Sequence, residues 1–180
     1  MKLNKIAAVG AAALLLTACS GLKEVKFEDF KKAVSEAKAE TYSKASVKVS
    51  LMEKEDGKET KKEKNVELKN VEGVWLPVID ITHEDYNYAA QAASMIGYND
   101  LDSIVKEYKE HEEISVKFFA GKGGFKMTAS GTHKMGTMDI NSVEEAEWGK
   151  GKELLKMSEK EETVDGKNAY ESVFTYTYTK

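Results

Sequence analysis

Alternating apolar and polar residues, interrupted by tight turns, constrain the fold of this chain more than any other feature. After residue 113 the alternation has the period of two that is typical of half-buried strands. The glycine-rich residues 121–124 and the Asp-Gly pair at 165–166 are the clearest turns between these segments. The pattern predicts successive antiparallel strands over residues 114–120, 125–130, 134–140, 152–161 and 168–179.

The first half of the chain adds helices to the strands. Phe27 and Phe30 begin a run with helical spacing, whereas Val47 and Val49 alternate with polar residues as in a strand. Pro77 predicts a break in any long central strand. The predicted elements are a helix over residues 27–40, strands over 46–51 and 59–68 joined by a turn at 56–57, an irregular segment over 71–81, and helices over 82–96 and 101–108.

Capping residues mark the ends of the two later helices. Thr82 with Asp85 three residues later resembles a capping box, and Gly97 is a natural helix stop. Asp100 is a suitable N-cap for the shorter helix that follows. We therefore expect both helices to lie as an insertion between two groups of strands.

These elements predict one α+β domain over residues 27–180. Its order is a helix, a group of strands, two helices and a second group of strands. An antiparallel meander in this order can curl its sheet around the helices. We expect a curved, open half-barrel sheet of about seven or eight antiparallel strands packed on about three helices.

The first 18 residues have the pattern of a secretory signal. Lys2 and Lys5 form a short positive region, and residues 6–18 form an uncharged run rich in alanine and leucine. A membrane-spanning helix needs roughly 20 apolar residues, which is longer than this run. Residues 1–18 are therefore expected to be removed as a signal peptide.

The residues at the end of that run, Leu16-Thr17-Ala18-Cys19, resemble the lipobox of bacterial lipoproteins at all four positions. The resemblance implies cleavage before Cys19, a diacylglyceryl thioether on its sulfur and an N-acyl chain on its new amino group. An ordinary secretory cleavage site prefers a small residue where Leu16 stands. Two acyl chains are enough for stable attachment to a membrane. We expect residues 19–26 to form a lipidated tether at the outer, extracytoplasmic face of the cell membrane.

The predicted order of elements resembles the LolA-like lipoprotein carriers and the related LprG-type lipoproteins. In that family a bent antiparallel sheet and its helices enclose an apolar space that binds acyl chains or whole lipids. Methionine and aromatic side chains suit such a space because they adapt to flexible ligands. The candidate residues for a ligand cavity are Met52, Met95, Phe118, Met127, Phe174, Tyr176 and Tyr178.

Charge and motif content argue against several other functions. The net charge is −4, or −6 without Lys2 and Lys5, and all 27 basic residues are lysines interspersed with acids, so nucleic acid is not an expected partner. His83, His111 and His133 lack the short spacing of zinc ligands. No serine elbow or phosphate-binding loop is present. We expect no catalytic residue, no metal and no cofactor apart from the lipid on Cys19.

Three functions from different classes remain open. The first is a membrane-anchored lipoprotein that binds a lipid or other hydrophobic ligand between its sheet and helices. The second is an interaction lipoprotein with a dry core, whose contact regions would be the hairpin of residues 52–66 and a turn containing Trp148. The third is a metal- or substrate-binding accessory to a transporter.

The lipobox generates a direct test. A Cys19→Ser substitution should abolish the acyl mass on the mature N-terminus and move the protein out of the membrane fraction, because no other attachment is expected. Mass spectrometry and cell fractionation measure both effects. Ser20→Ala, which leaves the lipobox intact, should stay lipidated; an unmodified Cys19 in the wild type would contradict the prediction.

Overall fold

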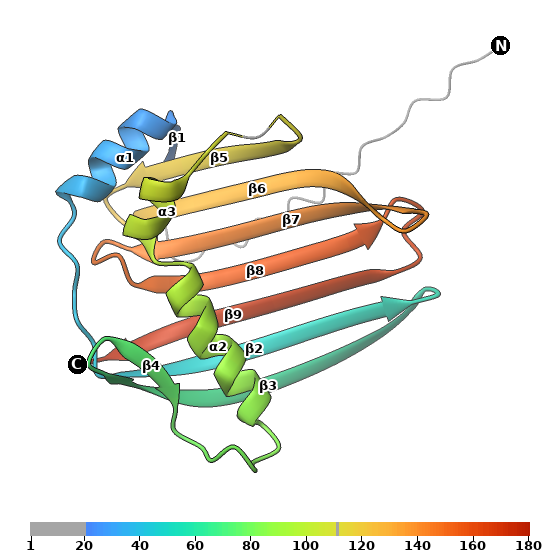
Figure 1. Cartoon of the computed structure of the whole chain (residues 1–180), viewed down its shortest axis with the longest axis horizontal. Helices are drawn as coiled ribbons and strands as arrows, with labels where there is room; N and C mark the ends of the chain where they lie inside the picture. The colour runs from blue at the N-terminus through green and yellow to red at the C-terminus, as the bar shows by residue number, and fades with distance from the viewer. Residues whose placement is uncertain (1–20, 111) are drawn as a thin grey trace.

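The computed structural model describes residues 21–110 and 112–180 as a nine-stranded antiparallel sheet with three helices on one face (Figure 1). The α+β class and the open, curved sheet that the sequence predicts are confirmed. The strands are β1 (Lys23–Val25), β2 (Lys44–Glu55), β3 (Lys58–Val71), β4 (Val74–Pro77), β5 (Ile114–Gly121), β6 (Gly124–Met135), β7 (Met138–Gly149), β8 (Leu154–Thr163) and β9 (Ala169–Thr179). The helices are α1 (Phe27–Glu36), α2 (Tyr86–Tyr98) and α3 (Leu101–Glu107).

The strands lie in the order β1-β5-β6-β7-β8-β9-β2-β3-β4. The meander β5 to β9 follows the chain, and β9 then pairs with β2, so the two halves of the chain share one sheet. The structure has more strands than expected because short strands, β1 and β4, occupy the two edges. Short edge strands expose few unpaired backbone groups.

Residues 23–25 were expected to belong to the tether, and the structure places them in the sheet. Lys23 pairs with Ala120 and Val25 with Phe118. Val25 is half-buried against the core, so apolar burial favours pairing over a free tether at this position. The predicted lipidation site, Cys19, lies outside the described residues.

The predicted strand over residues 134–140 is wrong because a hairpin turn divides it. Met135 pairs with Met138, and Gly136 takes a positive φ of 64° in the turn between them. The strand β7 then continues to Gly149, so Trp148 lies in a strand and not in the expected turn. The glycines that follow Trp148 mark the turn to β8, and this turn begins after Gly149. Alternation along β7 places Glu145 on the outer face, where it forms an ion pair with Lys126.

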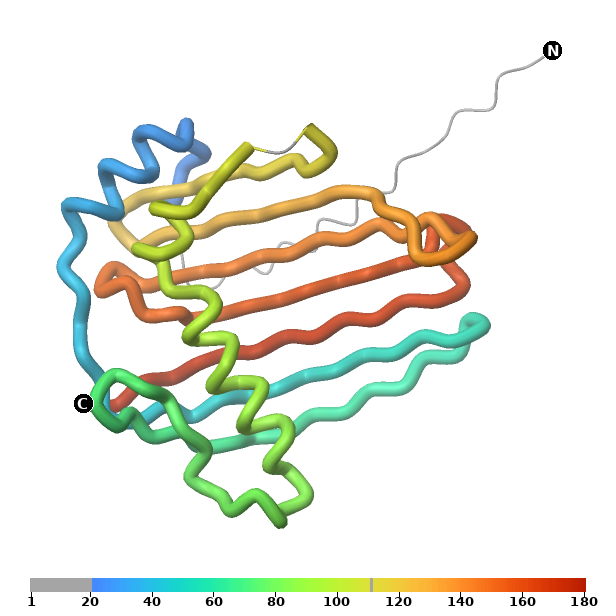
Figure 2. Tube along the Cα trace, in the orientation of Figure 1, coloured from blue at the N-terminus to red at the C-terminus, as the bar shows by residue number. Residues whose placement is uncertain are grey.

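Helix boundaries also differ from the prediction. The helix α1 ends at Glu36 instead of residue 40, and residues 37–43 run along the strand ends to β2 (Figure 2). The expected capping box is wrong: Thr82 hydrogen-bonds Asp80, and α2 begins at Tyr86. The expected cap at Asp100 is confirmed, because its Oδ2 accepts the Ser103 N–H at 2.9 Å.

An apolar row crosses the helix-covered face of the sheet. It contains Met127, Ala146, Met157, Phe174 and Val49, which are successive partners from β6 to β2. Burial of such side chains contributes about 25 cal/mol per Å² of apolar surface. This row forms the core together with the buried side chains of the adjacent sheet positions and of the helices.

One step farther from the core, the same face becomes mixed in character. Glu144 on β7 lies directly opposite Glu159 on β8. Burial, followed by the charges of Glu144 and Glu161, raises the pKa of Glu159. Like charges directly opposite each other destabilise a sheet. Because charged side chains occupy this row, the apolar region of the face ends here.

Aromatic side chains join the helices directly to the sheet. The buried Trp148 donates its indole Nε1–H to Asn99 O at 2.7 Å, and Tyr176 donates its hydroxyl to Ala92 O at 2.9 Å. The ring of Phe30 on α1 lies 5.0 Å from that of Phe118 on β5. These contacts fix the helices on the sheet by specific hydrogen bonds as well as by apolar packing.

The role of Trp148 predicts a loss of stability on substitution. Trp148→Phe removes the hydrogen bond to Asn99 and leaves a small cavity, which should lower the free energy of unfolding by about 2–3 kcal/mol. Denaturant unfolding measures this change. The matched variant Trp75→Phe, at a half-buried edge position, should cost less than about 1 kcal/mol. If the two variants lost the same free energy of unfolding, the role of Trp148 in fixing the helices on the sheet would be refuted.

Candidate functional site

The residues expected to line a lipid cavity do not line one cavity. Phe118, Phe174 and Tyr176 are 0–4% exposed and fill the space between the sheet and the helices. Met95 and Met127 are half-buried against the same core. These side chains act as packing residues in the described part of the chain.

Met52 is a correction to the predicted cavity. It pairs with Glu171 and Lys61, whereas Val49, three residues earlier on β2, pairs with Phe174. Because successive residues on a strand point to opposite faces, Met52 lies on the face away from the helices. The alternation of Val47 and Val49 with polar residues already places Met52 on the opposite face from them.

The other residues that the sequence analysis considered for contacts or metal binding do not lie together in one site. Trp148 is fully buried, so it cannot be a surface contact. His83 and His133 are exposed and lie on different elements, and His111 is outside the described residues. Within the described ranges, no three histidine, cysteine or acidic residues group as metal ligands.

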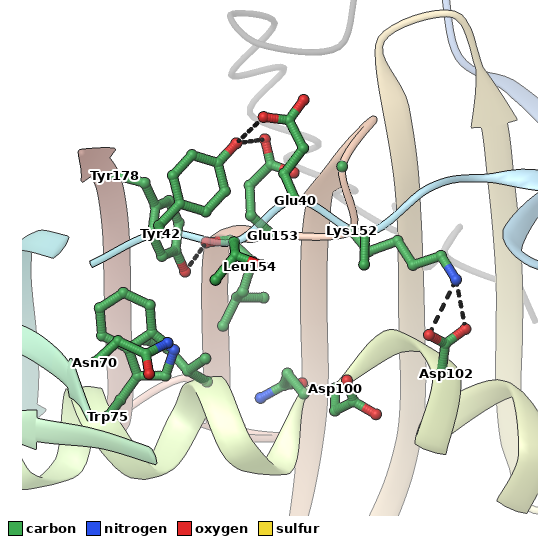
Figure 3. Close-up of a pocket in the computed structure, with 15 residues that line it drawn as sticks. Glu40, Tyr42, Asn70, Trp75, Asp100, Asp102, Lys152, Glu153, Leu154 and Tyr178 are labelled. Atoms are coloured by element: carbon green, nitrogen blue, oxygen red, sulfur yellow. Dashed lines mark hydrogen bonds and ion pairs between the residues drawn. The ribbon is translucent and has the colours of Figure 1, made fainter. Parts of the chain in front are cut away.

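The structure instead contains a cleft of about 260 Å³ at one end of the sheet (Figure 3). It lies where residues 39–42, the α2–α3 junction and the β7–β8 turn meet. Of the predicted cavity residues, it includes Tyr178. The residues lining it are Ala39, Glu40, Thr41, Tyr42, Asn70, Trp75, Ile96, Asn99, Asp100, Asp102, Gly151, Lys152, Glu153, Leu154 and Tyr178.

Three aromatic rings form one wall of the cleft. The rings of Tyr42 and Tyr178 are 5.0 Å apart, and those of Trp75 and Tyr178 are 5.5 Å apart with an edge-to-face orientation. Tyr178 points inward from β9 and donates its hydroxyl to Leu154 O at 2.8 Å. This hydrogen bond and the ring contacts hold the aromatic wall in place.

Carboxylates surround the hydroxyl of Tyr42. Its oxygen lies 3.2 Å from Glu40 Oε2 and 3.3 Å from Glu153 Oε1. A tyrosine hydroxyl has one proton, so it cannot fully satisfy both carboxylates. Lys180 lies 3.0 Å from Glu40. Glu153 Oε2 is buried and has no hydrogen-bond partner among residues 21–110 and 112–180. The Glu153 charge is therefore incompletely compensated.

The glycines of the β7–β8 turn make room for that carboxylate. A Cβ at Gly149 would collide with Glu153 Oε1, and one at Gly151 would lie 2.8 Å from Glu153 Oε2. Between them and Glu153, Lys152 takes a positive φ of 66° and contacts Asp102 on α3 at 2.8 Å. This ion pair closes the side of the cleft next to α3.

The titration behaviour of these groups reflects a negative environment. Burial, together with the charges of Glu153 and Glu40, raises the pKa of Tyr42 to about 12. Burial and the Glu153 charge also raise the pKa of Tyr178. Lys180 lowers the pKa of Glu40 through its hydrogen bond and its charge. The cleft thus favours cations and neutral hydroxyl groups.

A more open hollow of about 400 Å³ continues from the cleft toward the β3–β4 turn. The two spaces share Thr41, Tyr42 and Asn70. Glu72, Gly73 and Lys180 form the outer part of the hollow. The cleft therefore opens to the surface beside the C-terminus.

Sequence reasoning did not single out Tyr42, Trp75 or Glu153 as a group. They come from segments more than 30 residues apart, and none belongs to a recognisable motif. The turn predicted around Trp148 includes Gly149 and Gly151, but their contact with Glu153 exists only in the folded chain.

No family model and no curated protein sequence matches this chain. Among the described helices, none has the length and apolar character needed to cross a membrane. The site is therefore interpreted from its own geometry.

The cleft predicts an unusual tyrosine titration. In the wild type Tyr42 should ionise near pH 12, about two units above its ordinary pKa. The unfolded chain releases this proton first, so the Tyr42 contribution to stability is complete below pH 10 and is lost as the pH rises toward 12. The difference in tyrosinate absorbance between wild type and Tyr42→Phe measures the pKa.

A matched pair of variants tests the cause of the shift. Glu153→Gln should lower the pKa of Tyr42, because it removes a nearby negative charge. Glu67→Gln, an exposed substitution on β3 outside the cleft, should leave it unchanged. Ionisation of Tyr42 near pH 10 in the wild type would show that the carboxylates of the cleft do not create a negative potential at the Tyr42 hydroxyl.

Proposed function

We propose that this protein is a membrane-anchored, extracytoplasmic binding lipoprotein that holds a small, positively charged organic ligand in its cleft and catalyses no reaction. The observation that carries the proposal is the juxtaposition of three aromatic rings with the incompletely paired carboxylate of Glu153. Aromatic faces attract ammonium groups by about 0.5–2 kcal/mol, most strongly when water is excluded. A bound cation would also offset the charge of Glu153.

The dimensions of the cleft support a small ligand. Its volume of about 260 Å³ lies just below the range of roughly 300–1,000 Å³ that is typical of sites for drug-sized molecules. Its charged lining consists of the carboxylates of Glu40, Asp100, Asp102 and Glu153 and the single ammonium group of Lys152, so acids predominate. This lining is unlike the long apolar space that an acyl chain needs.

The function as a lipid carrier that the sequence suggested stays a prediction. The close packing of side chains between the sheet and the helices favours the alternative of an interaction lipoprotein with a dry core. Phe118, Phe174 and Tyr176 occupy the space in which the lipid was expected. In our proposal the protein is anchored through Cys19, and its binding site is the cleft at the strand ends. Mass spectrometry of gently extracted protein should find acyl chains bonded to Cys19 and no stoichiometric additional lipid; co-purification of such a lipid would favour the carrier.

Choline and 3,3-dimethylbutan-1-ol form a suitable pair of probes, because they have nearly the same shape and differ in charge. Choline should bind at least about tenfold more tightly, corresponding to roughly 1.4 kcal/mol. In NMR titrations of the mature protein in maltoside micelles, choline should shift the indole N–H signal of Trp75. The backbone N–H of Gly136, in the turn between β6 and β7 outside the cleft, should not shift and serves as an internal reference.

The same charge-matched variants test the site. Glu153→Gln should weaken choline binding about tenfold, whereas Glu67→Gln should leave it unchanged. Tyr178→Phe keeps the ring and should retain most of the affinity. Binding of choline without a shift at Trp75, or equal binding of the neutral isostere, would refute the proposed ligand chemistry.

A further inference from the structure

One end of the sheet collects the segments nearest to the predicted lipidation site. The backbone of Gly21 lies beside Gly121, and Lys23 pairs with Ala120. The β3–β4, β5–β6 and β7–β8 turns and the C-terminus lie at this same end (Figures 1 and 2). We call it the anchor end, and it comprises residues 21–22, 72–73, 122–123, 150–153 and 179–180.

The length of chain before Gly21 limits how far this end can lie from a lipid anchor. Cys19 is two residues before Gly21, and an extended chain spans at most about 3.6 Å per residue. An acylated Cys19 at the bilayer surface is thus no more than about 7 Å from Gly21. This reach holds the β1 edge of the anchor end next to the bilayer, whereas the β3–β4 turn, at the other edge of the sheet, lies there only if the whole end docks.

The turns of the anchor end carry exposed lysines. The ranges that define this end contain Lys122, Lys150, Lys152 and Lys180 against two acids, Glu72 and Glu153. Lys180 is also exposed, and its ammonium group contacts Glu40 at 3.0 Å. This end therefore presents positive charge in the direction of the anchor.

The three turns at the opposite end are different. We call this the far end, and it comprises residues 56–57, 136–137 and 164–168. Its ranges contain one lysine, Lys167, against two acids, Asp56 and Asp165, and Lys167 contacts Asp165 at 3.4 Å. The positive charge of the turns is thus concentrated at the anchor end.

Apolar side chains accompany the lysines. Val71 and Val74 flank the β3–β4 turn and are 45% and 58% exposed. Exposed apolar groups beside lysines are typical of surfaces that insert shallowly into the headgroup region of anionic bilayers. The turns of the opposite end also expose apolar side chains, at Met135, Met138 and Val164, so it is the charge that distinguishes the two ends.

We infer that the anchor end docks on the surface of an anionic lipid bilayer, so that the sheet stands on the membrane with the open side of the cleft at the lipid surface. The inference rests on the proposed anchoring through Cys19. The hollow beside Gly73 and Lys180 then faces the headgroups. A ligand of the cleft is taken up at the membrane surface.

Single cysteine labels test this orientation. Acylated Cys19 has no free thiol, and it is the only cysteine, so Val74→Cys and Thr137→Cys each provide one labelling site in the mature protein. The twelve residues of β7 separate the two ends by about 40 Å. In vesicles with anionic phosphatidylglycerol, a headgroup quencher should quench the label at position 74 and leave that at position 137 bright.

Lysine variants test the contribution of positive charge to the docking on the bilayer. The triple substitution Lys122→Gln, Lys150→Gln and Lys180→Gln should greatly reduce quenching at position 74. The matched far-end triple, Lys58→Gln, Lys134→Gln and Lys167→Gln, should not. Salt at about 1 M, which shortens the Debye length to about 3 Å, should act like the anchor-end triple.

The outcomes separate this inference from the anchoring itself. Equal quenching of the two labels, or none at position 74 in a protein whose acyl mass is present, overturns the docking and leaves the anchor intact. Quenching that is unchanged in neutral vesicles, or by the anchor-end triple, overturns the anionic surface as the partner. An unmodified Cys19 in the mass spectrum is the result that refutes the anchor, and the docking that rests on it.

Discussion

The pairing of β2 with β9 is the contact on which the rest of the structure depends. Residues 44–54 and 169–179 form a continuous antiparallel ladder that joins the first strands of the chain to the last. Closing so long a segment costs conformational entropy, which the burial of Val47, Val49 and Phe174 along this ladder helps to offset. Without it, the hairpin of β2 and β3 and the later meander would be separate sheets.

The helices depend on this shared sheet for a surface to cover. The helix α2 contacts β4, β3 and β2, while α1 contacts β5. The hydrogen bonds from Tyr176 and Trp148 then hold α2 and the α2–α3 junction over the middle of the sheet. The aromatic residues that looked suited to a lipid cavity are thus the residues that keep the layers together.

The same topology generates the cleft and the anchor end. Alternate turns of an antiparallel sheet lie at the same end, so β3–β4, β5–β6 and β7–β8 turns gather where residues 37–43 cross the strand ends. That crossing brings Tyr42 to Glu153, and β9 ends beside them at Tyr178. Binding at the cleft and docking at the membrane would therefore occur at the same end of the molecule.

The sequence by itself determined the α+β class, most of the strands and the cap at Asp100, because alternation and capping depend on neighbouring residues. It also contains the signal and lipobox pattern, from which the anchor at Cys19 remains a prediction. Local signals failed at Trp148, where the glycines of the next turn made the end of a strand resemble a turn, and at residues 23–25, whose pairing partner is about 95 residues away. Only the tertiary structure decided that Tyr42, Trp75 and Glu153 meet, since contacts between segments that are distant in sequence arise from long-range pairing that no local pattern records.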